Sequence, residues 1–183
     1  NQLGSGAYGT VYLVEKDNKK YAIKNQFINF NDVWMTKNQH LKKIKNEIDI
    51  SILMGKKNIG PKIYDYYICP IDMNRTSVLI VMEWMTEGSL SNWLLNNRLT
   101  KAHQKQINEK LEKLHKEKIV HSDLRDDNIF VTKKGSKIEF YIGDFGLSKT
   151  IEQLLEEHKS FDKSAIKQIY GNNFMLHHYV AKL

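Results

Sequence analysis

The segment 121–130, HSDLRDDNIF, gathers residue types that could bind a metal ion and handle a proton. Asp123 could accept or orient a hydroxyl proton, and Asn128 could offer an amide oxygen to a cation. Asp144, in GDFGL, could offer a carboxylate to the same cation, because magnesium prefers a few carboxylates together with phosphate oxygens. Such crowding suits a site that holds a metal-bound triphosphate opposite a nucleophile. Taken alone, 121–130 could equally be an acidic loop without a metal.

Two further segments could bind phosphate. The glycines of GSGAYGTV, at positions 4, 6 and 9, could bring backbone N–H groups close to phosphate oxygens, although a plain glycine hairpin is the alternative. Lys24, in the apolar stretch YAIK, needs a charged partner because burying a lone ammonium is costly. Glu47 lies on or beside the apolar face of the stretch that follows. Together Lys24 and Glu47 predict an ion pair that holds the ammonium against a polyphosphate.

Periodicity predicts the elements that would position the first of these residues. GTVYLVEK and KYAIKNQF alternate apolar and polar residues around the turn KDNKK, which predicts a hairpin. A helix is expected next, with Gly55 as its stop, because apolar residues recur at helical spacing. These residues are Leu41, Ile44, Ile48 and Ile52. Two more strands are expected in PKIYDYYICP and TSVLIVMEWM, so the first part should form a small sheet carrying one helix.

The pattern changes near Gly88, where we place a hinge. Ser89 is the expected N-cap of a short helix, and a long amphipathic helix is expected from about Thr100 to Lys116. NIFVT and IEFYIG predict two strands around a turn at 134–135, and a mostly helical segment is expected to run to Leu183. No internal repeat is found.

Composition limits the class of protein. The 183 residues, 41% of them apolar, suffice for one domain or for two small lobes sharing a hinge. The longest apolar run, VLIVM, ends at Glu83 and is too short to span a membrane. The net charge of +7 comes almost wholly from scattered lysines, so a solvated surface is favoured and nucleic acid is not an expected partner. The single cysteine, Cys69, suits a reducing cytosolic or nuclear compartment.

Taken in order, these motifs resemble those of the eukaryotic-type protein kinases. GSGAYGTV is similar to the glycine-rich loop, AIK to the lysine strand, HSDLRDDN to the catalytic loop and DFG to the metal-binding turn, with Glu47 as the partner on the regulatory helix. The resemblance covers the chain to about Leu147. It implies an α+β, bilobal fold over 1–183, with an antiparallel-sheet N-lobe carrying one helix, including the hinge, at 1–85. A shortened, mainly helical C-lobe is expected at 86–183.

The resemblance also implies an activity, the transfer of the γ-phosphoryl group of ATP to a protein hydroxyl. Asp123 would be the catalytic base, Arg125 would contact the γ-phosphate, and Lys24, paired with Glu47, would contact the α- and β-phosphates. Asn128 and Asp144 would hold Mg²⁺ or Mn²⁺. Met82 would be the gatekeeper before the hinge EWM at 83–85. The residues expected around the nucleotide are Leu3, Gly4, Ser5, Gly6, Ala7, Tyr8, Gly9, Val11, Ala22, Lys24, Met82, Glu83 and Met85.

The sequence departs from the family pattern in three places. Ser122 stands where an arginine usually follows the catalytic-loop histidine, so activation by loop phosphorylation is not expected. Arg125 stands where serine/threonine kinases resemble one another in having lysine, which favours Ser/Thr over Tyr specificity. Only 37 residues follow Gly146 and none reads A-P-E, so we expect a shortened C-lobe that a protein partner could cover. In this segment, Asp162 is expected to hydrogen-bond the catalytic loop, whereas a metal pair at His177–His178 is not expected.

Two alternatives to a protein kinase remain open on the sequence alone. One is a nucleotide-binding pseudokinase that acts as a partner-binding module, and the other is a small-molecule kinase of the aminoglycoside or choline type. The lysine- and asparagine-rich composition fits a compact viral kinase. A cytoplasmic location is therefore expected, in the host cytoplasm or the virion for a viral protein, with the nucleus as the second choice.

Overall fold

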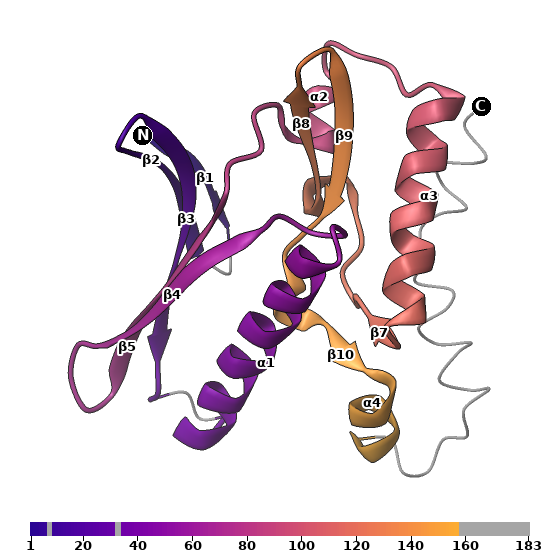
Figure 1. Ribbon diagram of the computed structural model, residues 1–183. Helices are drawn as coiled ribbons and strands as arrows, with labels where there is room; N and C mark the ends of the chain where they lie inside the picture. The colour runs from indigo at the N-terminus through magenta and orange to yellow at the C-terminus, as the bar shows by residue number, and fades with distance from the viewer. Residues whose placement is uncertain (7–8, 32–33, 158–183) are drawn as a thin grey trace.

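The computed structural model describes residues 1–6, 9–31 and 34–157. The first part of the chain forms a five-stranded antiparallel sheet with one long helix beside it (Figure 1). The strands are β1 (Gln2–Gly6), β2 (Gly9–Lys16), β3 (Lys19–Asn29), β4 (Ile63–Pro70) and β5 (Arg75–Glu83). They lie in the order β1-β2-β3-β5-β4, so β3 is the central strand and β4 is an edge.

The predicted hairpin is β2–β3, in which Val11 lies opposite Lys24. Asp17 and Asn18 form its turn with positive φ values of 51° and 58°, which is a conformation that Asn and Asp tolerate better than most residues. Alternation along β3 places Lys24 and Gln26 on the buried face of the sheet.

Helix α1 (Lys37–Lys56) covers that face. Thr36 caps its N-terminus in a reciprocal capping box with Gln39, and Ile44 and Ile48 pack against β5. The expectation that Gly55 stops the helix is wrong, because α1 continues to Lys56. Gly55 is instead a point of close approach, since an added Cβ would lie 2.7 Å from the Pro61 carbonyl oxygen.

The second part of the chain contains the remaining elements. They are β6 (Gly88–Ser89), α2 (Leu90–Trp93), α3 (Lys101–Lys116), β7 (Ile119–Val120), η1 (Asp126–Asn128), β8 (Ile129–Lys134), β9 (Lys137–Ile142), η2 (Phe145–Leu147), β10 (Lys149–Thr150) and α4 (Ile151–Glu157). β6, β8 and β9 form a three-stranded sheet, and β10 pairs with β7. The predicted cap at Ser89 is present, because its hydroxyl accepts from the Asn92 N–H. The long helix predicted from about Thr100 is α3, and Thr100 caps it.

The larger hydrophobic core connects the two parts of the chain. Met54 and Ile59, at and just beyond the end of α1, pack in one cluster with Leu114 of α3 and with Phe145. Each large side chain buried in this way contributes about 1.5–3 kcal/mol. The turn that contains Asp144 is thus anchored by its neighbour, Phe145, which is 2% exposed.

The structure confirms the α+β class and the antiparallel sheet with one helix. The first sheet ends at Glu83 and the next begins at Gly88, while the domain boundary at 85/86 stays a prediction. Of the mostly helical segment predicted to run to Leu183, the described residues contain only α4. Asp162 and His177–His178 lie outside the described residues. None of the helices in the described ranges is both long and apolar enough to cross a membrane.

Candidate active site

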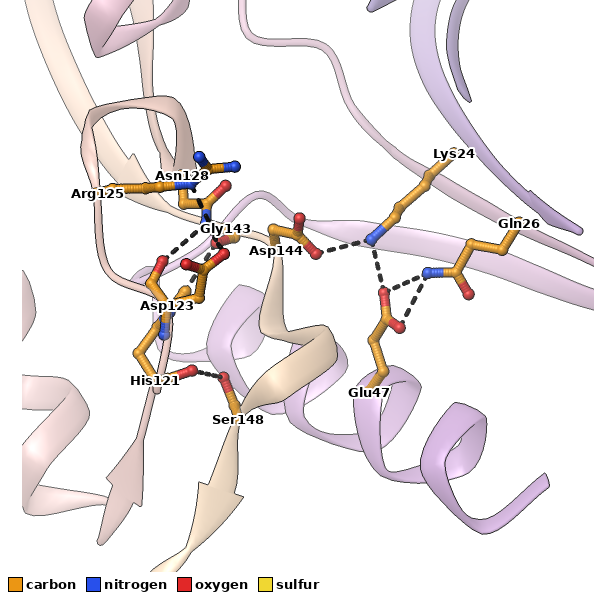
Figure 2. Close-up of polar contacts among 10 residues, drawn as sticks. All are labelled: Lys24, Gln26, Glu47, His121, Asp123, Arg125, Asn128, Gly143, Asp144 and Ser148. Carbon is orange, nitrogen blue, oxygen red and sulfur yellow. Dashed lines mark hydrogen bonds and ion pairs between the residues drawn. The ribbon is translucent and has the colours of Figure 1, made fainter. Parts of the chain in front are cut away.

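Lys24 lies at the centre of the candidate site. Its Nζ donates to Glu47 Oε1 at 2.8 Å and to Asp144 Oδ1 at 2.8 Å (Figure 2). The predicted pair between Lys24 and Glu47 is therefore present. Asp144 completes it from a turn 120 residues further along the chain. The three side chains come from β3, α1 and the turn after β9, so the site forms only when both parts of the chain pack together.

The two carboxylates keep the Lys24 ammonium charged. Burial lowers the pKa of Lys24, but the negative charges of Glu47 and Asp144 and their hydrogen bonds outweigh it, so the pKa lies above its ordinary value. A buried ammonium fixed between two carboxylates is a rigid positive charge at neutral pH. That is the property needed to hold a polyphosphate.

Asp144 adopts a strained backbone conformation, with φ 58° and ψ 69°. Residues other than glycine occupy the left-handed region rarely, and such conformations persist when their surroundings hold them. Here Phe145 is buried on one side, and the Gly143 N–H donates to the Asn128 carbonyl at 2.8 Å on the other. In this backbone conformation the Asp144 carboxylate points towards Lys24 and accepts its hydrogen bond.

The segment 121–128 holds Asp123 beside Asn128. The Asn128 side-chain amide donates to the Asp123 carbonyl at 2.7 Å and to Asp123 Oδ2 at 2.9 Å (Figure 2). Both bonds use the amide nitrogen, so the amide oxygen is the atom that could face a cation. Arg125 is about half exposed, with Nε 3.7 Å from Asp123 Oδ2 and Nη1 3.5 Å from Asp127 Oδ2. The predicted residues of this loop are thus brought together.

His121 connects this loop to the Asp144 turn. It is 1% exposed, and its Nε2 lies 2.9 Å from the Gly143 carbonyl oxygen, while its Nδ1 accepts from the Asp123 N–H at 3.4 Å. The backbone donor at Nδ1 places the proton on Nε2, which donates to Gly143. The Ser148 hydroxyl donates to the His121 carbonyl at 3.1 Å. No role for His121 was predicted from the sequence, although it is the first residue of the segment HSDLRDDNIF.

Acidification is expected to destabilise the fold through His121. Burial lowers the pKa of His121 below its ordinary value, although the Gly143 carbonyl and the nearby carboxylates of Asp144 and Asp123 oppose this. The unfolded chain then binds the proton more readily, so the stability present above about pH 6.5 is lost as the pH falls, by at most about 1.4 kcal/mol per pH unit. Urea unfolding at pH 7.5 and 5.5 measures this loss. A His121→Gln variant keeps a donor for Gly143, and an equally steep loss in that variant would assign the effect to another group.

The donor set fits a magnesium site that shares its ligands with a nucleotide. Asp144 and Asn128 supply one carboxylate and one amide oxygen. Among residues 1–6, 9–31 and 34–157, no group of three or more His, Cys, Asp or Glu side chains is placed to hold a metal ion by itself. Magnesium commonly binds through one or two protein oxygens, with phosphate oxygens and water completing the shell. The residues present therefore suit an ion that arrives with a phosphate ligand.

A pocket lies beside the ion-paired group. Lys24, Glu47, Met82, Asp144 and Phe145 contribute to its lining, together with residues of β4, β5 and β8. Met82, the predicted gatekeeper, thus lines the same pocket as the lysine that would bind phosphate.

The other described residues expected around the nucleotide lie on β1, β2 and β3 or at and just after the end of β5. Ala22 and Met85 are buried, Val11 is half-buried opposite Lys24, and Leu3 is 46% exposed. The following glycine-loop residues are exposed: Gly4, Ser5 and Gly6. Gly9 has φ 128°, and an added Cβ there would lie 2.3 Å from the Asn25 carbonyl oxygen, so only glycine fits. Ala7 and Tyr8 lie outside the described residues.

The predicted hinge is tied to the second part of the chain at Glu83. The Glu83 N–H donates to the Lys62 carbonyl at 2.8 Å, and Glu83 Oε1 lies 3.3 Å from Lys134 Nζ on β8. Lys134 also contacts Glu139 and the Tyr141 hydroxyl on β9. This network fixes the chain at the point where the first sheet ends.

Comparison with known proteins agrees with this geometry. The model of the protein kinase domain family matches residues 1–172. The chain belongs to the protein kinase domain family, whose members generally use ATP and Mg²⁺. The fold and the resemblance recognised in the motifs are both confirmed by this match.

The relatives are named as serine/threonine-protein kinases or as mitogen-activated protein kinase kinase kinases. Over 158 residues, 82% of this chain, it is 31% identical to the serine/threonine-protein kinase WNK6 of rice (Oryza sativa subsp. japonica), of which it covers 35%. It is 28% identical to human mitogen-activated protein kinase kinase kinase 3, covering 83% of this chain and 24% of the relative. It is 29% identical to a protein of Acanthamoeba polyphaga mimivirus named as a serine/threonine-protein kinase, and the match covers 81% of this chain and 26% of that protein. The chain thus spans about a third or less of the length of these relatives.

Proposed function

We propose that this chain is an ATP-dependent protein kinase that transfers the γ-phosphoryl group to serine or threonine hydroxyls of a protein substrate. The observation that carries the proposal is the contact of one buried ammonium, Lys24, with the carboxylates of both Glu47 and Asp144 at 2.8 Å. An acidic loop with Asp123 and Asn128 is joined to the same turn through His121 and Gly143. Names of the relatives support serine/threonine rather than tyrosine specificity.

Each residue has a role in this proposal. Bound ATP supplies the γ-phosphoryl group, and Mg²⁺ or Mn²⁺ supplies positive charge that offsets the negative charge of the phosphates. Lys24 binds the α- and β-phosphates, while Asn128 and Asp144 hold the metal ion. Asp123 orients the substrate hydroxyl and accepts its proton, and Arg125, with its exposed guanidinium, contacts the γ-phosphate.

The proposal also covers how the domain is regulated, what partner it has and where it acts. Ser122 supplies no guanidinium for a phosphorylated loop, so we propose that the domain is active without loop phosphorylation. We also propose a protein partner that covers the C-lobe at 86–183, and a cytoplasmic or viral setting. The lysine- and asparagine-rich composition and the mimivirus relative support the viral setting.

The test is an incubation of the purified chain with labelled ATP, Mg²⁺ and a general protein substrate, followed by mass spectrometry of the chain and the substrate. Phosphoserine or phosphothreonine that depends on Asp123 is the expected result. Stabilisation by ATP without transfer to any acceptor would favour a nucleotide-binding pseudokinase. Transfer only to members of a metabolite panel would favour a small-molecule kinase.

A further inference from the structure

Gln26 is a buried polar residue two positions after Lys24 on β3. It is 5% exposed, and strand alternation places it on the same face as Lys24, beneath α1. A polar side chain buried on a sheet face is costly unless it finds a hydrogen-bond partner. Gln26 therefore needs an acceptor or donor within the site.

Its partner is the carboxylate of Glu47. Gln26 Nε2 donates to Glu47 Oε1 at 2.8 Å and to Glu47 Oε2 at 2.9 Å (Figure 2). Oε1 also accepts from Lys24. Gly146 closes the other side, where an added Cβ would lie 3.1 Å from Glu47 Oε2. The carboxylate is thus fixed in position and in rotation by contacts on both of its oxygens.

We propose that Gln26 is a positioning residue of the phosphotransfer site, whose amide holds the Glu47 carboxylate in the orientation that fixes the Lys24 ammonium for phosphate. The inference rests on the proposed function and adds to it a residue that touches neither nucleotide nor substrate. Without the amide, the carboxylate could rotate within its pocket, and Lys24 would lose part of its alignment. A misplacement of this kind lowers the rate without removing any catalytic group.

The helix itself has a separate anchor at the preceding residue. Asn46 Nδ2 donates to the Ser148 carbonyl at 2.8 Å, and Asn46 Oδ1 accepts from Gln153 Nε2 at 2.8 Å. These bonds hold α1 against the segment that follows the Asp144 turn. Loss of the Gln26 amide should therefore free the Glu47 side chain while α1 stays docked, so nucleotide affinity and rate should change more than the fold does.

The experiment compares Gln26→Leu with Gln26→Glu in the full chain. Leucine keeps a similar volume but cannot donate, and it should lower kcat/KM for ATP by roughly 10- to 100-fold, the factor that a hydrogen bond to a charged group supplies. The affinity for Mg²⁺-ATP, measured by calorimetry, should fall as well. At pH 8, Gln26→Glu should lower kcat/KM for ATP more than Gln26→Leu does, because the new carboxylate and that of Glu47 then repel each other. It should recover towards pH 6, where they can share one proton.

Asn25→Leu is the matched control. Asn25 is the residue before Gln26 on β3 but faces the other side of the sheet, where its Oδ1 accepts from the Ser77 hydroxyl at 2.7 Å. This variant loses one side-chain hydrogen bond on the same strand without touching Glu47. It should stay within about twofold of the wild type in kcat/KM and should show no recovery at low pH, because the lost bond to Ser77 is made on the opposite face of the sheet from Glu47.

The outcomes separate the two proposals. If the wild type transfers phosphate and Gln26→Leu matches it in rate and in ATP affinity, the positioning role is wrong. The same conclusion follows if kcat/KM falls as much in Asn25→Leu as in Gln26→Leu. It also follows if kcat/KM of Gln26→Glu depends on pH no more than that of the wild type does. If the wild type binds ATP but transfers nothing, the proposed function fails, and ATP affinity decides the role of Gln26. If the wild type does not bind ATP, both are overturned.

Discussion

Replacing Asp123 with asparagine is expected to lower the rate of phosphoryl transfer by about 10²- to 10⁴-fold, the range that a positioned general base contributes. The substitution keeps the shape of the side chain and removes its ability to take a proton. Its Oδ1 can still accept the bond that Asn128 now donates to the carboxylate at 2.9 Å, so the loop should keep its conformation. The affinity for ATP should change little, because Asp123 is not among the groups that contact Lys24.

Asp127→Asn is the control for this variant. Asp127 lies in the same loop, where its Oδ1 accepts from the Ser91 hydroxyl at 2.6 Å and its Oδ2 lies 3.5 Å from Arg125. Initial rates with labelled ATP, alongside thermal unfolding with and without ATP, measure both variants. A transfer rate for Asp123→Asn within tenfold of the wild type, with Asp127→Asn equally affected, would exclude Asp123 as the base.

Several elements, in both parts of the chain, could be predicted because each has a local signal. The hairpin of β2 and β3 follows from period-two alternation around Asp17 and Asn18, and α3 follows from its apolar spacing and the Thr100 cap. Gly55 misled the prediction for α1, since a glycine near a helix end usually marks the stop. Here packing against Pro61 requires it, and no local pattern reveals a contact that the later chain creates.

The candidate site was predictable in its parts but not in its assembly. The pair of Lys24 and Glu47 follows from burial, since an ammonium on an apolar strand needs a carboxylate. The direct contact of Lys24 with Asp144 depends on a left-handed turn 120 residues away, which sequence patterns do not specify. Gln26 was missed although alternation from Lys24 points it inward, because glutamine in a strand is usually read as a solvent-facing residue.

Replacing Lys24 with methionine is expected to lower phosphoryl transfer by about 10²- to 10³-fold, the loss typical when one preorganised electrostatic donor is removed. Methionine keeps most of the length of the side chain but removes the ammonium, with its charge and the hydrogen bonds that it donates to Glu47 and Asp144. The variant should also be less stable, because Glu47 and Asp144 would keep their negative charges without the ammonium between them. Removing one partner of a buried ion pair costs about 3–5 kcal/mol. The lower end is expected here, since Gln26 still donates to Glu47 and the Asp144 side chain is 25% exposed.

The pH dependence of the free energy of unfolding tests this prediction. In the wild type the raised pKa of Lys24 means that its stabilising contribution is present below about pH 10.5 and is lost as the pH rises through the folded value. In Lys24→Met that alkaline loss should disappear, and urea unfolding between pH 7 and 11 measures the difference. Glu47→Gln added to Lys24→Met removes one of the two carboxylates, so it should restore stability without restoring transfer. A double variant no more stable than the single one would mean that the carboxylates are not what the lysine neutralises, and the electrostatic account of this site would then have to be abandoned.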